Sequence, residues 1–476
     1  MRVLFTGTEL FPHVKVGGLA DVMAALPKAL RAQGVDVRVL LPGYPALKRA
    51  AVPLEPLVVL GDLMGGGEAR ILLGRCPARL PIYLLDQPAF FHTDTPYAAA
   101  GTLPLGFGAL SWAAAHLGRH GDGHGWCPDL VHAHDWPTGL APAYLALAGA
   151  PRPRTALTIH NLAYQGLFPA DLLVPLGLPE DCFTPGGVEF YGRIGFLKAG
   201  LMYADGLTTV SPTYAQEILG PAGLGLEGVL QHRNGSLRGI LNGVDESVWD
   251  PARDPHLPRP FDRDHLEARR PGKLDLQRSL GLQEAPEAFL VAVVSRFAGE
   301  KGLDLVLEAL PWFAGHGIQL AVLGQGEADL EARFLAASRL HPGQVAVHLG
   351  YDEALSHRIY GGADALLVPS RHEPCGLTQM YAMRYGAVPL VRATGGLADT
   401  VTDATPEALK ADRATGFTFL EPDSAALEAA LGRALGLFRD HPAAWTALQR
   451  RGMAREAGWG PSARAYLAFY EKLLRA

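Results

Sequence analysis

The pentapeptide Gly-Gly-Leu-Ala-Asp stands at residues 17–21 and again at residues 395–399, near opposite ends of this 476-residue chain. A short apolar stretch precedes each copy, at 2–6 and at 387–391, and a helical pattern follows it. Paired glycines between a strand and a helix let the backbone approach a ligand closely, and the helix start offers unpaired N–H groups to an anion. Either copy alone could be an ordinary turn that uses glycine for packing. Their duplication predicts two Rossmann-like halves that face one ligand.

Short apolar strands alternate with helices along the whole chain, a pattern typical of parallel sheets covered by helices on both faces. The stretch 250–273 interrupts this alternation. It contains five prolines and many charges, and is interpreted as a linker or surface excursion. The expected strands are 3–6, 36–41, 82–85, 130–134, 155–160 and 206–211 before it, and 289–295, 319–323, 345–349, 365–369 and 387–391 after it. The expected helices include 19–33, 107–119, 425–439, 443–455 and 463–474.

Composition and charge exclude several classes of protein. The formal net charge is −6, and the 42 Lys and Arg residues are scattered, so the chain has no basic stripe for nucleic acid and no polybasic segment for a membrane surface. No apolar run is long enough to span a bilayer, and the N-terminus leads directly into a strand without a cleavage site. We therefore expect a cytoplasmic protein. Its four cysteines, Cys76, Cys127, Cys182 and Cys375, lie far apart, which argues against a disulfide framework or a structural zinc.

Polar residues follow several of the expected strands, where open parallel sheets bind their ligands. Together they supply cations, carboxylates, an imidazole and two helix N-termini. This set suits a nucleotide diphosphate whose charge must be neutralised as it departs from a neutral group. The residues are Lys15 before the first glycine pair, His132 to Asp135, His160 and Asn161, Arg296 and Lys301, and Arg371 to Thr378.

Two groups within this set have other readings. Arg296 and Lys301 could be solvated surface charges, although two cations at the end of one strand make that reading less favoured. His132 and His134 form an H-x-H pair on one strand face, as in some metal sites. No third ligand converges on them in the sequence, so we predict no metal site.

An ordered series of motifs resembles that of bacterial glycogen synthases and plant starch synthases, which are retaining glycosyltransferases that use ADP-glucose. The series extends from Thr8-Glu9 to Gly458-Trp459 and so covers most of the chain. The resemblance implies the GT-B fold, an α/β fold of two Rossmann-like domains with a central cleft between them. The implied bounds are 1–245 for the acceptor-side domain, 246–456 for the donor-binding domain, and 457–476 for a final helix that crosses back. The motifs are Lys15 to Leu19, His132 to Trp136, Thr158 to Asn161, Ser295-Arg296 with Lys301-Gly302, Gly350 to Asp352, Glu373 to Leu377 and Thr394 to Leu397.

The resemblance also implies roles for residues of this sequence. The proposed catalytic group is Lys15, Asp135, His160, Arg296, Lys301 and Glu373. Among these, Arg296 and Lys301 would clamp the diphosphate, Glu373 would lie beside the transferred glucose, His160 would lie near the reacting carbon, and Asp135 would face the acceptor. Tyr351 would stack on the adenine. Further substrate contacts are implied for Gly17, Gly18, Asp21, Asn161, Cys375, Gly376, Leu377 and Thr378.

The implied reaction moves glucose from ADP-glucose to the non-reducing 4-hydroxyl of an α-1,4-glucan such as glycogen, with retention of configuration and release of ADP. No carboxylate stands out as an opposite-face nucleophile, which favours front-face attack, with the departing phosphate as base. No cofactor or metal is expected, because protein cations would stabilise the leaving group. The segment 90–106 departs from the family pattern, so acceptor contacts there are open.

Other classes remain to be weighed. A dinucleotide-dependent dehydrogenase should show G-x-G-x-x-G after its first strand, whereas this chain has Gly7-Thr8-Glu9. A scaffold that only binds glucan would be expected to lack at least one of Lys15, Arg296, Lys301 and Glu373, and all four are present. A synthase that uses UDP-glucose stays open, because the groups that bind phosphate would be common to both donors.

Overall fold

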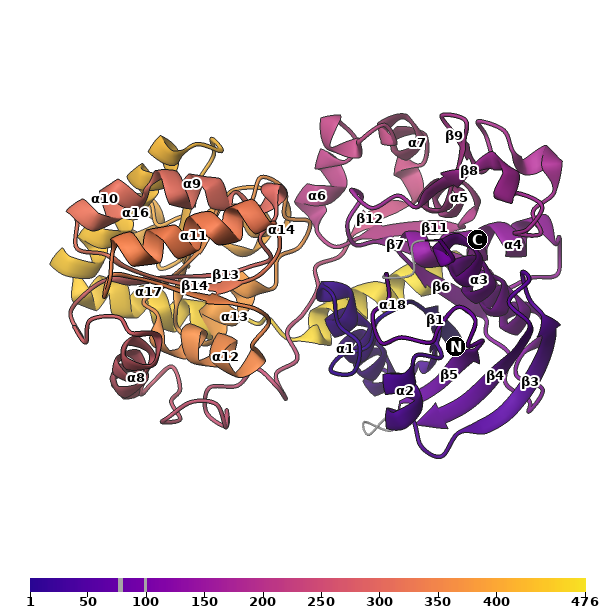
Figure 1. Ribbon diagram of the computed structural model, residues 1–476, viewed down its shortest axis with the longest axis horizontal. Coiled ribbons are helices and arrows are strands. Elements are labelled where there is room, and N and C mark those ends of the chain that lie inside the picture. Colours follow the sequence, from indigo (N-terminus) through magenta and orange to yellow (C-terminus); the bar gives the residue numbers. More distant parts are fainter. Residues whose placement is uncertain (76–79, 98–100) are drawn as a thin grey trace. The chain divides into compact units, whose positions relative to one another are not determined.

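The chain folds into two compact units, each built on its own sheet (Figure 1). The computed structural model describes residues 1–75, 80–97 and 101–476. The first unit comprises Met1–Gly243 together with Trp459–Ala476, and the second comprises Val244–Gly458. Cys76 and residues 98–100 of the atypical 90–106 segment lie outside the described residues. Within the described residues, none of the helices has the length and apolar character needed to cross a membrane.

The first unit contains a nine-stranded sheet in which every strand predicted for this half of the chain is confirmed. β1 (Arg2–Thr6) lies at its centre, parallel to β2 and β6. β4 runs antiparallel to both β3 and β5, and neither β3 nor β4 was predicted. β3 is largely exposed and its register with β4 shifts twice, so it lacks the buried apolar run of a central strand. The sheet order is β12 (Leu237–Gly239), β11 (Gly206–Thr209), β7 (Arg154–Ile159), β6 (Leu130–His134), β1, β2 (Asp36–Pro42), β5 (Pro81–Asp86), β4 (Glu68–Arg75) and β3 (Glu55–Asp62).

Helices and a small second sheet complete the first unit. The last helix, α18 (Trp459–Arg475), packs on α1 (Gly18–Ala32) and buries Tyr466 and Tyr470 completely. This packing ties the C-terminal helix to the core around β1. The other helices are α2 (Pro45–Ala50), α3 (Leu103–His120), α4 (Leu140–Leu147), α5 (Phe196–Tyr203), α6 (Pro212–Glu217) and α7 (Glu227–His232), and the small antiparallel sheet has the order β8 (Leu167–Pro169), β10 (Arg193–Gly195), β9 (Glu189–Phe190).

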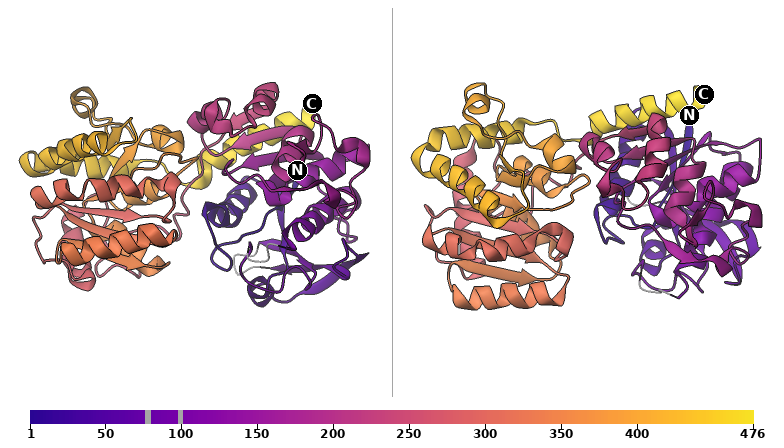
Figure 2. Two further views of the ribbon diagram at one scale, coloured as in Figure 1. Left: turned by 45° about the horizontal axis from the view of Figure 1, so that its top comes forward. Right: turned by 90° about the horizontal axis from the view of Figure 1, so that it is seen from above.

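The second unit contains a six-stranded, wholly parallel sheet with helices on both faces (Figures 1 and 2). Its central strands are continuous apolar runs, as expected for strands buried on both faces. The order is β15 (Val345–Leu349), β14 (Gln319–Gly324), β13 (Leu290–Val294), β16 (Ala365–Val368), β17 (Val388–Arg392) and β18 (Phe417–Phe419). The helices are α8 (Arg270–Leu280), α9 (Leu303–Glu308), α10 (Leu310–Gly315), α11 (Ala328–Leu340), α12 (Glu353–Gly362), α13 (Thr378–Arg384), α14 (Gly395–Thr400), α15 (Pro406–Lys410), α16 (Ser424–Asp440) and α17 (Pro442–Ala454).

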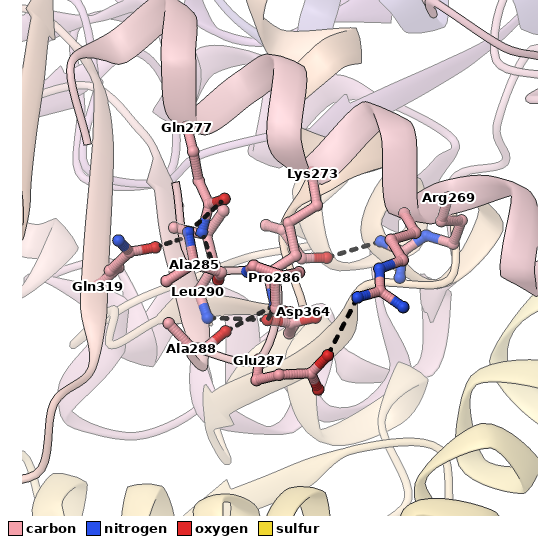
Figure 3. A network of polar contacts seen from close by, with 12 residues as sticks. Arg269, Lys273, Gln277, Ala285, Pro286, Glu287, Ala288, Leu290, Gln319 and Asp364 are labelled. Carbon is pink, nitrogen blue, oxygen red and sulfur yellow. Dashed lines mark hydrogen bonds and ion pairs between the residues drawn. The ribbon is translucent and has the colours of Figure 1, made fainter. Parts of the chain in front are cut away.

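The linker interpretation of 250–273 is wrong for its C-terminal part, which is packed into the second unit (Figure 3). Lys273, in the first turn of α8, forms a buried ion pair with Asp364 at 2.7 Å and donates to the carbonyls of Pro286 and Ala288. Arg269 is buried and donates to the carbonyl of Ala363 at 2.6 Å. Charges that resemble a solvated surface in the sequence are satisfied internally here, which only the tertiary contacts reveal.

Candidate functional site

In each of the two large sheets, there is one point from which successive strands of the chain are added in opposite directions. In the first unit it lies between β1 and β6, and in the second it lies between β13 and β16. Loops that leave adjacent strands on opposite sides of such a point open a crevice at the carboxyl ends of the strands, where open α/β sheets bind ligands. The predicted site residues follow these strands or their neighbours in both units, so the two rims are described in turn.

The loop after β1 is organised by Glu9, a residue to which the sequence analysis assigned no role. Its buried carboxylate accepts the backbone N–H groups of Val16 (2.7 Å) and Gly17 (3.0 Å), and the hydroxyl of Tyr97 donates to its other oxygen at 3.0 Å. Burial raises the pKa of Glu9. The N–H of Gly17, a predicted substrate contact, is thus bonded to a protein carboxylate, while a Cβ on Gly17 would meet no atom within 4 Å.

Lys15 lies in the same loop, held at its charged end. Its ammonium pairs with Asp21 of α1 at 3.2 Å and lies 4.8 Å from the centre of the Phe11 ring. Both side chains of the pair are mostly buried, with 20% and 16% of their surface exposed. Lys15 and Asp21, both predicted substrate contacts, are therefore brought together by the structure.

Asp135 fixes the start of the loop after β7. Its backbone has a positive φ of 57°, and its carboxylate accepts the N–H groups of His160 (2.7 Å) and Asn161 (3.4 Å). Burial raises the pKa of Asp135 to about 7, although the two backbone hydrogen bonds favour its charged form. Three predicted site residues, Asp135, His160 and Asn161, are thus adjacent, and the carboxylate of Asp135 accepts backbone N–H groups of the other two.

Three neutral imidazoles lie in β6 and directly after β7. Nδ1 of His134 lies 2.9 Å from Nε2 of His160, and burial lowers the pKa of both His132 and His160 to about 3. Nε2 of His134 is buried without a hydrogen-bond partner. Because buried N–H groups are rarely left unpaired, we assign Nε2 as unprotonated. His134 then donates from Nδ1 to His160, whose own ring proton resides on Nδ1.

His132 is a structural residue rather than a ligand. Its ring nitrogens bond to the hydroxyls of Tyr470 (2.7 Å) and Thr158 (2.6 Å), so it joins α18 to the sheet of the first unit. Among the residues that the structure describes, no group of three or more His, Cys, Asp or Glu side chains is placed to hold a metal ion.

The rim of the second unit is built from ion pairs. Nζ of Lys301, after β13, lies 2.7 Å from the carboxylate of Glu373, which follows β16, and the Ser370 hydroxyl donates to the same oxygen at 2.8 Å. Both members of the pair are about 15% exposed. Arg296 pairs with Glu300 at 3.0 Å and is 45% exposed. The two predicted cations therefore differ, because Lys301 is anchored at the reversal point whereas Arg296 extends towards solvent.

The Glu373 loop is held by residues on both sides. Gly376 has a positive φ of 68°, and buried Gln379 donates to the carbonyls of Cys375 (3.2 Å) and Gly376 (2.8 Å). Cys375 is buried, Leu377 precedes α13, and Thr378 begins that helix.

The second glycine pair packs directly beneath the Glu373 loop. A Cβ on Gly395 would lie 2.1 Å from the carbonyl oxygen of Glu373, and one on Gly396 would lie 1.9 Å from that of Cys375. The N–H of Gly396 also donates to the Glu373 carbonyl at 3.1 Å. Packing, the alternative considered for each copy, therefore explains this one.

Tyr351 lies apart from these residues in the order of the sheet. It follows β15, the edge strand, two strands away from β13. The residue is 64% exposed, and its hydroxyl bonds to the carboxylate of Glu353. The ring therefore offers a face to a ligand without being part of the Lys301–Glu373 cluster.

Sequence reasoning missed Glu9, Tyr97, Ser370 and Gln379. Glu9 and Ser370 each lie within three residues of a strand end, a signal that could have identified them. Tyr97 and Gln379 carry no comparable signal, since their partners are distant or backbone atoms.

Comparison with known proteins identifies the family. The model for the starch synthase catalytic domain matches residues 2–232, and that for glycosyl transferases group 1 matches residues 280–438. The glycogen synthase of Roseobacter denitrificans is 48% identical over all of both chains, and that of Yersinia pestis (strain Pestoides F) is 50% identical over 99% of this chain and 100% of its own. This chain belongs to the glycogen and starch synthase family.

Solved structures agree with this assignment. The catalytic domain of starch synthase IV from Arabidopsis thaliana, bound to ADP and acarbose, is 32% identical, with a TM-score of 0.91 over 100% of this chain and 99% of its own. Sucrose-phosphate synthase from Thermosynechococcus elongatus, at 19% identity and a TM-score of 0.63, shares the fold. The prediction of a glycosyltransferase of GT-B fold, with two Rossmann-like domains, is thereby confirmed.

Proposed function

We propose that this glycosyltransferase transfers glucose from ADP-glucose to the 4-hydroxyl at the non-reducing end of an α-1,4-glucan, with retention of configuration and release of ADP. The observation that carries the proposal is the partly buried Lys301–Glu373 pair, where the strand order of the second unit reverses. A cation and a carboxylate held 2.7 Å apart can each interact with a different part of a sugar diphosphate when it binds. The ammonium then faces the departing phosphate, and the carboxylate faces the sugar that becomes electron-poor.

The leaving diphosphate would be stabilised by Lys301 and Arg296. Arg296 presents a planar fork of N–H donors, whereas Lys301 acts as a compact point charge. Lys15, with the loop around Gly17 and Gly18, would contact the phosphate or the departing sugar. Cys375, Gly376, Leu377 and Thr378 would line the sugar and phosphate pocket, and Tyr351 would stack on the adenine.

The residues after β6 and β7 suit a neutral acceptor. As the bond from the anomeric carbon to the phosphate breaks, the 4-hydroxyl attacks on the same face, and its proton passes to the departing phosphate oxygen. A positively charged ring beside the electron-poor carbon would oppose this step. His160, with a pKa lowered to about 3, is neutral at physiological pH, and Asp135 holds its backbone and that of Asn161 in place.

The test uses ADP-glucose and UDP-glucose, each labelled in the sugar, with glycogen as acceptor. We expect transfer from ADP-glucose with one ADP released for each glucose added. Digestion of the product with β-amylase, which cleaves α-1,4 bonds, should release the label as maltose. Transfer from UDP-glucose alone would overturn the donor assignment, and transfer from neither donor would overturn the function.

We also infer that the protein acts in the cytoplasm. Cys127 and Cys182 form no disulfide bond in the part of the chain that the structure describes, a state that a reducing compartment maintains.

A further inference from the structure

Two residues of the first unit combine a large, exposed apolar side chain with a left-handed backbone conformation. Tyr191 is 81% exposed, the highest value among the large hydrophobic residues that the structure describes, and Leu224 is 52% exposed. Both have left-handed φ values, +48° for Tyr191 and +50° for Leu224. Such conformations are strained for residues with bulky side chains, and local strain of this kind gathers at functional sites.

Tyr191 lies at the tip of a tight hairpin. β9 and β10 pair directly at Phe190 and Arg193, so the connection has two residues, Tyr191 and Gly192, both with positive φ. Asn-Gly is the sequence that such a turn favours. A tyrosine here gives up turn stability and gains an exposed aromatic ring, so the ring itself is the feature to explain.

The base of the hairpin is hydrogen-bonded to a buried lysine. The ammonium of Lys198 is buried and donates to the carbonyls of Pro185 (2.7 Å), Gly187 (3.0 Å) and Glu189 (2.5 Å). The Phe190 and Tyr191 rings meet edge to face, with their centres 4.7 Å apart. Tyr191 is therefore displayed from a fixed base, the property that a stacking surface requires.

Leu224 lies beside this hairpin. An atom added to Gly225 as a Cβ would lie 3.3 Å from the Phe190 ring and 3.6 Å from the Tyr191 ring. The Gln165 side chain donates to the Leu224 carbonyl at 3.1 Å, which joins this turn to the loop after β7. That loop carries Tyr164, which is 48% exposed, and begins with His160 and Asn161. Figure 1 shows β8, β9 and α7 gathered at one end of the first unit.

We propose that Tyr164, Tyr191 and Leu224 form an apolar platform, with two aromatic rings and one aliphatic side chain, that binds the α-1,4-glucan chain as it extends from the acceptor position. The proposal rests on the proposed function. A glucan is uncharged, and each pyranose ring has an apolar face of C–H groups beside a rim of hydroxyls. Exposed aromatic rings match the apolar face, and the polar side chains of Gln165 and Arg193 donate to carbonyls of the neighbouring Leu224 and Leu167. Continuity with His160 and Asn161 along one loop favours a glucan over a protein partner.

The test compares glycogen binding and kinetics between wild type and Tyr191→Asn. Asparagine suits the left-handed turn, so this variant removes the ring while keeping the hairpin. Retardation in native gels that contain glycogen should weaken about fivefold, the size expected for the loss of one aromatic contact. The KM for glycogen should rise by a similar factor, whereas kcat and the KM values for ADP-glucose and maltotriose should not change. Tyr191→Trp should restore binding.

Val59→Thr is the matched control. Val59 is also exposed, but it belongs to β3, an edge strand of the nine-stranded sheet, and so lies outside the segments that form the platform. Wild-type glycogen retention by Tyr191→Asn would overturn the platform, as would a joint loss of kcat and donor affinity, which would indicate a structural role. Should Tyr191→Asn not fold, Leu224→Asn replaces it. Absence of glucose transfer by the wild-type protein would count against the proposed function, whereas gel retardation tests the platform without catalysis.

Discussion

The two copies of Gly-Gly-Leu-Ala-Asp have the same sequence and different surroundings. At residues 17–21, a Cβ on the first glycine would meet nothing within 4 Å, and its N–H binds the carboxylate of Glu9. At residues 395–399, both glycines press against carbonyl oxygens of the Glu373 loop. The first copy leaves space for a ligand, and the second supports a neighbouring loop. An identical motif between a strand and a helix therefore does not imply an identical role.

The rims on which these two copies lie also differ, in the charge of the groups that form them. After β6 and β7, the rim of the first unit consists of neutral imidazoles and a carboxylate whose pKa is raised to about 7, whereas its loop after β1 holds the Lys15–Asp21 ion pair. The rim of the second unit consists of paired charges, Lys301 with Glu373 and Arg296 with Glu300. The neutral groups after β6 and β7 suit an uncharged sugar acceptor, and the ion pairs of the second unit suit a diphosphate. Five predictions test this contrast.

The largest expected effect is on the second glycine pair. Gly396→Ala should lower the free energy of unfolding of the protein by about 3 kcal/mol or more, because the new Cβ would lie 1.9 Å from a backbone oxygen. Chemical denaturation monitored by tryptophan fluorescence gives the value. A change below about 0.5 kcal/mol would mean that the loop moves freely and that packing does not explain this copy.

Removal of either cation in the second unit should impair transfer without unfolding the protein. Lys301→Ala and Arg296→Ala should each lower kcat/KM for the donor by roughly a hundredfold, since loss of a charge from a phosphate site costs about 3 kcal/mol. Steady-state kinetics at saturating glycogen measures this. Lys410→Ala, which removes an exposed lysine of α15, is the control. Near-wild-type transfer by either variant would make that residue a solvated surface charge.

Asp135 should make stability depend on pH. Its pKa is about 7 in the folded protein and near 3.8 when unfolded, so the folded state holds a proton that the unfolded state has lost between these values. Its contribution to stability is therefore lost as pH rises from about 4 to 7. Asp135→Asn cannot ionise, so over this pH interval its free energy of unfolding should rise by at least about 1 kcal/mol relative to that of wild type. Parallel pH profiles for the two proteins in thermal unfolding would contradict the raised pKa.

Gly17→Ala provides the counterpart to Gly396→Ala. Its φ of −148° is accessible to alanine and its Cβ position is open, so the free energy of unfolding should change by no more than about 0.5 kcal/mol. Donor affinity should nevertheless weaken if the open space belongs to the ligand. Isothermal titration with ADP-glucose measures the second effect. Strong destabilisation would show that the two copies are equivalent after all.

The smallest expected effect is that of a chelator. Because Lys301 and Arg296 are expected to carry the charge of the leaving diphosphate, EDTA should leave the rate of glucose transfer unchanged within error. Loss of transfer in EDTA that Mg²⁺ or Mn²⁺ reverses would mean that these cations do not suffice.

Much of the molecule was determined by the sequence alone. Apolar runs bounded by glycine and polar residues identify the central parallel strands, because such strands are buried on both faces and must be apolar throughout. The ordered motifs identify the family, and placement after strand ends identifies Lys15, Asp135, His160, Lys301 and Glu373 as residues that share a rim with others of their unit.

Only the tertiary structure decided which of these residues contact one another and which other residues hold their loops in place. Glu9 binds the loop of Lys15 and Gly17, and Gln379 braces the loop of Glu373, through hydrogen bonds to backbone atoms that no sequence pattern encodes. The charges around Lys273 are indistinguishable from a solvated surface until their partner Asp364, 91 residues away, is placed beside them. Sequence patterns report burial and local geometry. The pairing of distant charges, and the space in front of or behind a glycine, depend on how the chain returns to the same point.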